Sequence, residues 1–211
     1  MKIGLIVEGD AEYRALPNLL PRVASPHTIL RQPLLCPVQP KSPPALIAHV
    51  AATKSFPILI AKGVDLIVLI IDKENRPECT IELVQEIERE ARSRLDETVN
   101  LRVVLKVTKL ENWLVADPQA LLDLPGLFER EHAERIEKQV AGRADAVDAH
   151  ALLKTCSRKR AYDKKTGAIE ICKKLDPERA RKNSRSFRKL LKTLGCPEPP
   201  VDTVRARARR R

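Results

Sequence analysis

Carboxylates follow two apolar stretches of this chain, and their position after those stretches suggests that they form a metal site together. Residues 3–7 carry no polar side chain and lead directly into Glu8. A second, mostly apolar stretch at residues 64–71 leads into Asp72, with Glu74 two positions further on. Apolar runs of this kind predict strands buried on both faces, as in a parallel sheet. Because parallel strands end at the same edge of a sheet, we expect these three acids to lie together there.

Three carboxylates at one edge repel one another unless a cation neutralises them. Hard oxygen ligands of this type suit Mg²⁺ or Mn²⁺, so the pattern predicts a metal site formed by Glu8, Asp72 and Glu74. Glu12 follows one helical turn after Glu8 and could reach the same ion. A simpler interpretation also stands, in which Asp10 and Glu12 only stabilise the first turn of a helix through its dipole.

Two acidic motifs resemble those of a known family. Val7-Glu8-Gly9-x-x-Glu12, followed by a strand that ends in Asp72-x-Glu74, resembles the Toprim domain of topoisomerases, primases and OLD-type nucleases. Residues 110–117, Leu-Glu-Asn-Trp-Leu-Val-Ala-Asp, resemble a second acidic motif of small stand-alone bacterial Toprim-like proteins, some of them linked to phage defence. One departure is that the usual Asp-x-Asp is Asp72-x-Glu74, whose longer second side chain could alter the metal geometry.

The resemblance implies a Mg²⁺-dependent nuclease, a hydrolase that cleaves phosphodiester bonds. Glu8 is then a metal ligand or a general acid or base, and Asp72 and Glu74 hold the metal. Glu111 follows the last strand as a fourth acid of the site, so the candidate catalytic residues are Glu8, Glu12, Asp72, Glu74 and Glu111. We expect Glu111 to face this site and Trp113 to pack in the core behind it. The family link to defence systems further implies that an ATPase partner protein could be present.

The apolar pattern predicts an α/β fold, with helices between successive strands. Strands are expected at residues 3–7, 28–38, 65–72 and 101–107, and helices at residues 11–20, after Pro43 and at 78–98. Pro17 should kink or split the first helix, and Pro57 should break the second. The expected architecture is a Toprim-like, about four-stranded, mainly parallel sheet with flanking helices. We divide the chain into an α/β domain at residues 1–117, a helical basic extension at 118–196 and a basic tail at 197–211.

Positive charge is concentrated at the end of the chain. Residues 1–150 hold 19 Lys and Arg against 22 Asp and Glu, whereas residues 151–211 hold 20 against 6. Such asymmetry indicates a polyanionic partner, and a nucleic acid, DNA or RNA, is the expected one. Solubility and a solvated tail would explain the same charge. The candidate nucleic-acid-binding residues are Arg158, Lys159, Arg160, Lys164, Lys165 and Arg185.

The cysteines, the apolar segments and the glycines of the chain bear on its location and on the classes of protein it can belong to. The five cysteines form no Cys-x-x-Cys pair, and no segment suggests a secretion signal or a membrane span, so we expect a cytoplasmic protein without a membrane partner. No Lys-Thr pair is preceded by the glycines of a nucleotide-binding loop. Two alternatives to the nuclease remain: a non-catalytic nucleic-acid-binding module, and a phosphatase or phosphotransferase acting on small phosphorylated substrates.

Overall fold

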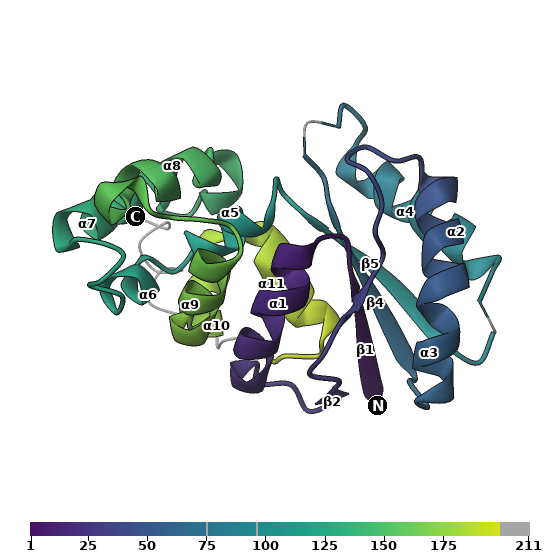
Figure 1. Cartoon of the computed structure of the whole chain (residues 1–211). Helices are drawn as coiled ribbons and strands as arrows, with labels where there is room; N and C mark the ends of the chain where they lie inside the picture. The colour runs from purple at the N-terminus through teal and green to yellow at the C-terminus, as the bar shows by residue number, and fades with distance from the viewer. Residues whose placement is uncertain (75, 96, 199–211) are drawn as a thin grey trace, which may run out of the picture.

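The chain folds around a parallel sheet with helices on both faces (Figure 1). A computed structural model describes residues 1–74, 76–95 and 97–198, with Arg160 described by its backbone only. The strand order is β2-β1-β4-β5, and β3 also pairs with β1. The strands are β1 (Lys2–Val7), β2 (Thr28–Ile29), β3 (Leu34–Leu35), β4 (Leu66–Asp72) and β5 (Asn100–Lys106). The predicted α/β class, with a mainly parallel sheet, is therefore confirmed.

The strand expected at residues 28–38 is instead two short strands, so the sheet has five strands rather than about four. The strand β2 pairs with the start of β1, where Thr28 lies opposite Lys2, and β3 pairs with its end, where Leu34 lies opposite Ile6. Pro33 lies between them and has no N–H to donate to a ladder, which accounts for the interruption.

One face of the sheet is covered by α2 (Pro44–Lys54), α3 (Phe56–Ala61) and α4 (Thr80–Arg92) (Figure 1). Side chains of β4 such as Ile67 and Leu69 pack there with Leu83 and Ile87 of α4. The break between α2 and α3 falls at Ser55, next to Pro57, as the sequence predicts. The helix expected at residues 78–98 is shorter and ends at Arg92.

The other face is covered by α1 (Asp10–Leu19) and α11 (Arg185–Thr193). Of the two predicted effects of Pro17, a split of α1 is wrong, because a single helix continues past this residue, and a kink stays a prediction. Proline has no N–H for the carbonyl four residues earlier, which here belongs to Tyr13. The Gln32 side chain supplies the missing donor, with Nε2 3.2 Å from the Tyr13 carbonyl oxygen.

The helical C-terminal region continues the core of this second face. Its helices are α5 (Leu110–Leu114), α6 (Pro118–Leu122), α7 (Arg130–Val140), α8 (Ala149–Cys156), α9 (Thr166–Lys174) and α10 (Pro177–Asn183). Short 3₁₀ turns cover Leu20–Arg22, Ala144–Ala146 and Arg158–Arg160. Trp113 and Phe187 share one buried cluster with Val68 and Val104 of the sheet. The proposed boundary after residue 117 stays a prediction, and the basic tail lies outside the described residues from residue 199 on.

None of the described helices is both long enough and apolar enough to cross a membrane.

Candidate functional site

The carboxyl ends of three neighbouring strands bring the predicted acids together. Glu8 follows β1, Asp72 ends β4, and β5 ends in Lys106, which lies opposite Asp72 in the β4–β5 ladder. A pocket of about 290 Å³ opens at this edge. We call it the acid pocket; it is lined by Gly9, Asp10, Ala11, Glu12, Asp72, Glu74, Lys109, Leu110, Glu111, Lys164 and Lys165.

Lys106 is the centre of the charge arrangement, and its side chain is fully buried. Its ammonium lies 2.8 Å from Asp72 Oδ1 and forms a second ion pair with Glu12 Oε1. Burial alone would lower the pKa of Lys106, but the two carboxylates outweigh it and raise that pKa above its ordinary value. A buried, charged ammonium therefore binds two of the predicted acids. Lys106 is not among the site residues predicted from the sequence, because a lysine near a strand end is usually solvated and no sequence pattern sets it opposite Asp72.

The acids around Lys106 differ in their proton affinity. For Glu12, burial raises the pKa, but the Lys106 ammonium more than offsets it and the net pKa is lowered. For Asp72, burial outweighs Lys106, so the pKa is raised. Glu8 is half-buried, and its Oε2 accepts a hydrogen bond from the Asp72 backbone N–H at 2.8 Å. Burial raises the pKa of Glu8 to about 7, against the opposing effect of that hydrogen bond. Glu8 thus titrates near neutrality.

Gly9 makes room for the Glu12 carboxylate. The backbone of Gly9 is extended, with φ −117° and ψ 159°, so the turn itself does not require glycine. A Cβ atom at this position would lie 2.5 Å from Glu12 Oε2. The glycine therefore permits the close approach of Glu12 to the strand end.

Glu74 stands on the pocket wall in an unusual backbone conformation. Its φ of 49° lies in the left-handed region, which non-glycine residues adopt at a cost in free energy. Its N–H donates to the Thr108 carbonyl at 3.1 Å, and Lys73 N–H donates to the Lys106 carbonyl at 2.8 Å. These bonds anchor the chain after β4 to the chain after β5, so that Glu74 is held beside Asp72.

The donor set is oxygen-rich, as Mg²⁺ requires, but the acids do not form a closed cage. Within residues 1–74, 76–95 and 97–198, no group of three or more His, Cys, Asp or Glu side chains is arranged to hold a metal ion. Lys106 provides part of the neutralising charge that the sequence analysis assigned to a metal. The assignment of Glu8, Asp72 and Glu74 as one ligand set stays a prediction.

Glu111 and Trp113 point in the different directions that the sequence analysis expects. Glu111 lines the acid pocket, where its Oε1 lies 3.2 Å from His150 Nδ1 and 3.6 Å from Lys164 Nζ. Trp113 is buried, and its Nε1 donates to Ser186 Oγ at 2.8 Å. The sequence analysis assigned no role to His150, because nothing in its spacing linked α8 to the motif on α5.

The predicted basic residues separate into two groups. Lys164 and Lys165 line the acid pocket together with Lys109. Arg158 lies elsewhere, since its Nη1 pairs with Glu129 at 3.1 Å and its Nε donates to the Pro125 carbonyl. Lys159 and Arg185 do not line the acid pocket; Lys159 is exposed in the turn that also holds the backbone of Arg160, and Arg185 starts α11.

Comparison with known proteins identifies a family without assigning a function. Searches of curated proteins and of solved structures give no match. A family model described as a domain of unknown function, DUF4276, matches residues 7–195, which include both acidic motifs and nearly all of the helical region. The chain belongs to the DUF4276 family.

Proposed function

We propose that this protein is a Mg²⁺-dependent nuclease of the Toprim type that acts in the acid pocket. One observation carries the proposal: buried and half-buried acids outnumber the lysine ammonium groups that line the acid pocket. Asp10 is ion-paired with Arg14 at 2.9 Å. Among the described residues that line the pocket, that leaves four acids, Glu12, Asp72, Glu74 and Glu111, and three lysines, Lys109, Lys164 and Lys165. Glu8 and Lys106 do not line it, but both bond to Asp72.

Mg²⁺ does not need a closed protein cage. It is usually bound by one or two carboxylates, with water and substrate phosphate oxygens completing its coordination. Asp72 and Glu74, adjacent on the pocket wall, are the residues that would hold it. When bound, the ion would polarise the phosphodiester and lower the pKa of a coordinated water.

The other residues in and around the pocket have separate roles in the proposed reaction. Glu8, with a pKa of about 7, accepts a proton from the attacking water near neutral pH. Lys106 keeps Glu12 charged and holds Asp72 at the strand end. Lys164 and Lys165 contact phosphate oxygens, which carry the negative charge of the substrate. Glu111 positions Lys164 through their 3.6 Å ion pair.

The test is cleavage of end-labelled single-stranded and duplex DNA and RNA with Mg²⁺, with Mn²⁺ or with a chelator. We expect cleavage only with metal, and we expect Asp72→Asn to reduce the rate at least about 100-fold. Asp123→Asn is the matched control, because Asp123 is exposed beyond α6 and does not line the acid pocket. It should cleave at the wild-type rate.

The alternatives give different results in the same assay. Metal-independent binding without any cleavage would overturn the nuclease and leave a nucleic-acid-binding module. Hydrolysis of a phosphomonoester, with polynucleotides left intact, would indicate a phosphatase acting through the same acids. Cleavage that Asp72→Asn leaves unchanged would place the chemistry outside the acid pocket.

A further inference from the structure

Between the acid pocket and the opposite end of the sheet lies a series of hollows, each of which shares one lining residue with the next. The acid pocket shares Lys109 with a hollow of about 310 Å³ beside α5 and α8. That hollow shares Asp145 with one of about 720 Å³ between α4 and α11. The third shares Lys189 with a pocket of about 440 Å³ at the amino ends of β4 and β5. We call the last two hollows the β5-edge groove, because β5 is the last strand of the sheet.

One wall of the β5-edge groove is a row of cations on α11. Arg185, Lys189 and Lys192 line it, are exposed, and are spaced four and three residues apart, so they share one face of the helix. Lys192 pairs with Glu198 at 3.4 Å on the surface, and no ion pair is found for Arg185 or Lys189 among the described residues. The opposite face of α11, with Phe187 and Leu191, is buried in the core. The row is therefore held rigidly toward the groove.

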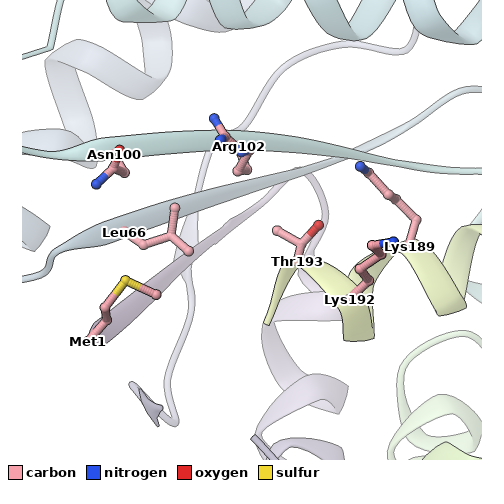
Figure 2. A pocket seen from close by; sticks show the side chains of 7 residues that line it. All are labelled: Met1, Leu66, Asn100, Arg102, Lys189, Lys192 and Thr193. Atoms are coloured by element: carbon pink, nitrogen blue, oxygen red, sulfur yellow. The ribbon is translucent and has the colours of Figure 1, made fainter. Parts of the chain in front are cut away.

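The cations continue across the groove onto the strand. Figure 2 shows Lys189 and Lys192 on α11 at one side of the last pocket, with Arg102 and Asn100 on β5 at the other. Arg102 is exposed. Three basic side chains from two elements thus surround one hollow at the far end of the sheet.

The other wall of the β5-edge groove is apolar. It is formed by Ile81 and Val84 of α4 with Val103 and Leu105 of β5, and Ile81 is 67% exposed. Val84 is half-buried, and Val103 and Leu105 are buried. Aliphatic surface that stays open to a groove, as at Ile81, suggests that another molecule covers it.

A protein strand added to β5 is a weaker explanation of the same groove. Part of the free edge of β5 is already occupied by side chains of α4. Glu88 Oε1 accepts the Val103 N–H at 2.8 Å, and Arg92 Nη2 donates to the Leu101 carbonyl at 2.7 Å. A continuous ladder with a new strand would have to break both bonds.

We infer that the β5-edge groove binds one single strand of nucleic acid, whose path leads to the acid pocket; this inference rests on the proposed nuclease function. Phosphates lie along Arg185, Lys189 and Lys192, and unpaired bases lie against Ile81 and Val84. A duplex hides its base faces and would leave the apolar wall without a partner. From Arg185 to Lys192 the helix rises about 10 Å, which matches about three stacked nucleotides of one strand.

The test is binding, measured in a chelator so that cleavage is not required. A fluorescein-labelled 12-nucleotide oligothymidine and a hairpin duplex are titrated with wild-type protein and with the double variant Lys189→Gln/Lys192→Gln. We expect the variant to bind the single strand at least about tenfold more weakly. Its slope of log affinity against log salt should be shallower by about 1.4, since two phosphate contacts are lost.

The matched control is Lys173→Gln/Lys174→Gln on α9. These lysines are also exposed and adjacent on one helix, and neither lines the groove. The control should change affinity less than about twofold, so a general effect of net charge is separated from the groove. Ile81→Ser should weaken single-strand binding and leave duplex binding unchanged. Melting curves establish that all variants are folded.

Two results would overturn the inference. Unchanged single-strand affinity in Lys189→Gln/Lys192→Gln would remove the cationic row from the binding path, whatever the enzyme cleaves. Absence of oligonucleotide binding by wild-type protein would favour an acidic protein segment as the occupant of the groove. Conversely, binding that depends on the groove, in a protein that never cleaves, would overturn only the proposed function.

Discussion

Two ion-pair clusters in this molecule each share one cation between two acids, but they differ in how many backbone N–H groups the acids accept. At the sheet edge, Lys106 is shared by Glu12 and Asp72, with Glu8 beside them. In the helical region, Asp117 is 1% exposed and Arg179 binds it with two nitrogens, Nε at 2.7 Å and Nη2 at 2.9 Å.

The second cluster also shares one cation between two acids, because Arg179 Nη1 lies 3.4 Å from Asp176 Oδ2, but there both carboxylates also accept backbone N–H groups. Asp117 Oδ2 also accepts the Asp176 N–H at 2.7 Å, which ties α6 to the start of α10. Hydrogen bonding to Asp117 raises the pKa of Arg179 further above its ordinary value. At the sheet edge, by contrast, the pKa of Glu8 is raised to about 7 and that of Asp72 is also raised. Acids that accept both an arginine and backbone N–H groups join helices, whereas the acids with raised pKa values at the sheet edge are available for proton transfer or cation binding.

The largest expected effect on stability comes from removing the Lys106 ammonium, which Glu12 and Asp72 share. Lys106→Met leaves Glu12 and Asp72 buried without a counter-charge, so the free energy of unfolding should fall by about 3–5 kcal/mol at pH 7. Urea denaturation measures it. Lys174→Met, at an exposed position on α9, is the control and should change stability by less than about 0.5 kcal/mol.

A second variant tests whether the loss is electrostatic. Adding Glu12→Gln and Asp72→Asn to Lys106→Met removes the stranded charges, so part of the lost stability should return. A triple variant less stable than Lys106→Met would mean that Lys106 acts mainly by filling space, and the comparison between the clusters would fail.

The next largest effect on stability is expected at the ion pair between Asp117 and Arg179. Asp117→Asn keeps the shape but loses the charged acceptor for Arg179, so we expect a loss of about 2–3 kcal/mol in the free energy of unfolding. Any nuclease activity should be unchanged, since Asp117 does not line the acid pocket. Denaturation and cleavage of the labelled oligonucleotide measure the two quantities. A loss of activity without a loss of stability would show that the two clusters are coupled.

The sequence predicted β1, β4 and β5 and the acids that follow β1 and end β4, because apolar runs and parallel pairing place Glu8 and Asp72 at one edge without further information. The division of residues 28–38 into β2 and β3 was not predicted. The sequence also did not predict Lys106 as the partner of Asp72. A lysine at a strand end is usually solvated, and only the β4–β5 register sets it opposite Asp72. Asp117 shows the converse: it belongs to an acidic motif, yet it joins α6 to α10 rather than lining the pocket.

Contacts between segments far apart in the sequence could not be predicted, because they depend on tertiary packing. The uninterrupted α1 depends on Gln32, whose side chain reaches the Tyr13 carbonyl from the β2–β3 connection. His150 meets Glu111 only because α8 packs beside α5. Both contacts are set by tertiary packing, whereas periodicity reports only which face of an element is buried.

A smaller effect on stability is expected when Arg179 is replaced by lysine, which tests the geometry of its pair with Asp117 separately from its charge. Arg179→Lys keeps the positive charge but loses the paired donors, so stability should fall by about 1 kcal/mol. The control is Arg130→Lys in the exposed Arg130–Glu134 pair, where the change should be below about 0.5 kcal/mol. Chemical denaturation of both variants gives the comparison. Equal losses would mean that burial of Asp117 adds nothing to its pair.

The smallest effect on stability, with a definite sign, is expected for Glu8→Gln. The pKa of Glu8 rises from an ordinary 4.5 to about 7 on folding, so between these pH values the folded protein holds a proton that the unfolded chain has released. Wild-type stability should therefore fall as pH rises from about 4.5 to about 7. A glutamine does not titrate, and its amide oxygen can still accept the Asp72 N–H.

We therefore expect Glu8→Gln to gain stability relative to wild type as pH increases from 4.5 to 7, by about 1 kcal/mol or less, since Glu8 is only half-buried. Denaturation at pH 5 and pH 8 measures that difference. If Glu8 also accepts the proton from water, wild-type cleavage should rise about tenfold per pH unit below pH 7 and then level off, and Glu8→Gln should lack this rise. A stability difference that is constant with pH would show that Glu8 is ionised throughout. The edge cluster would then be as fully compensated as the pair between Asp117 and Arg179.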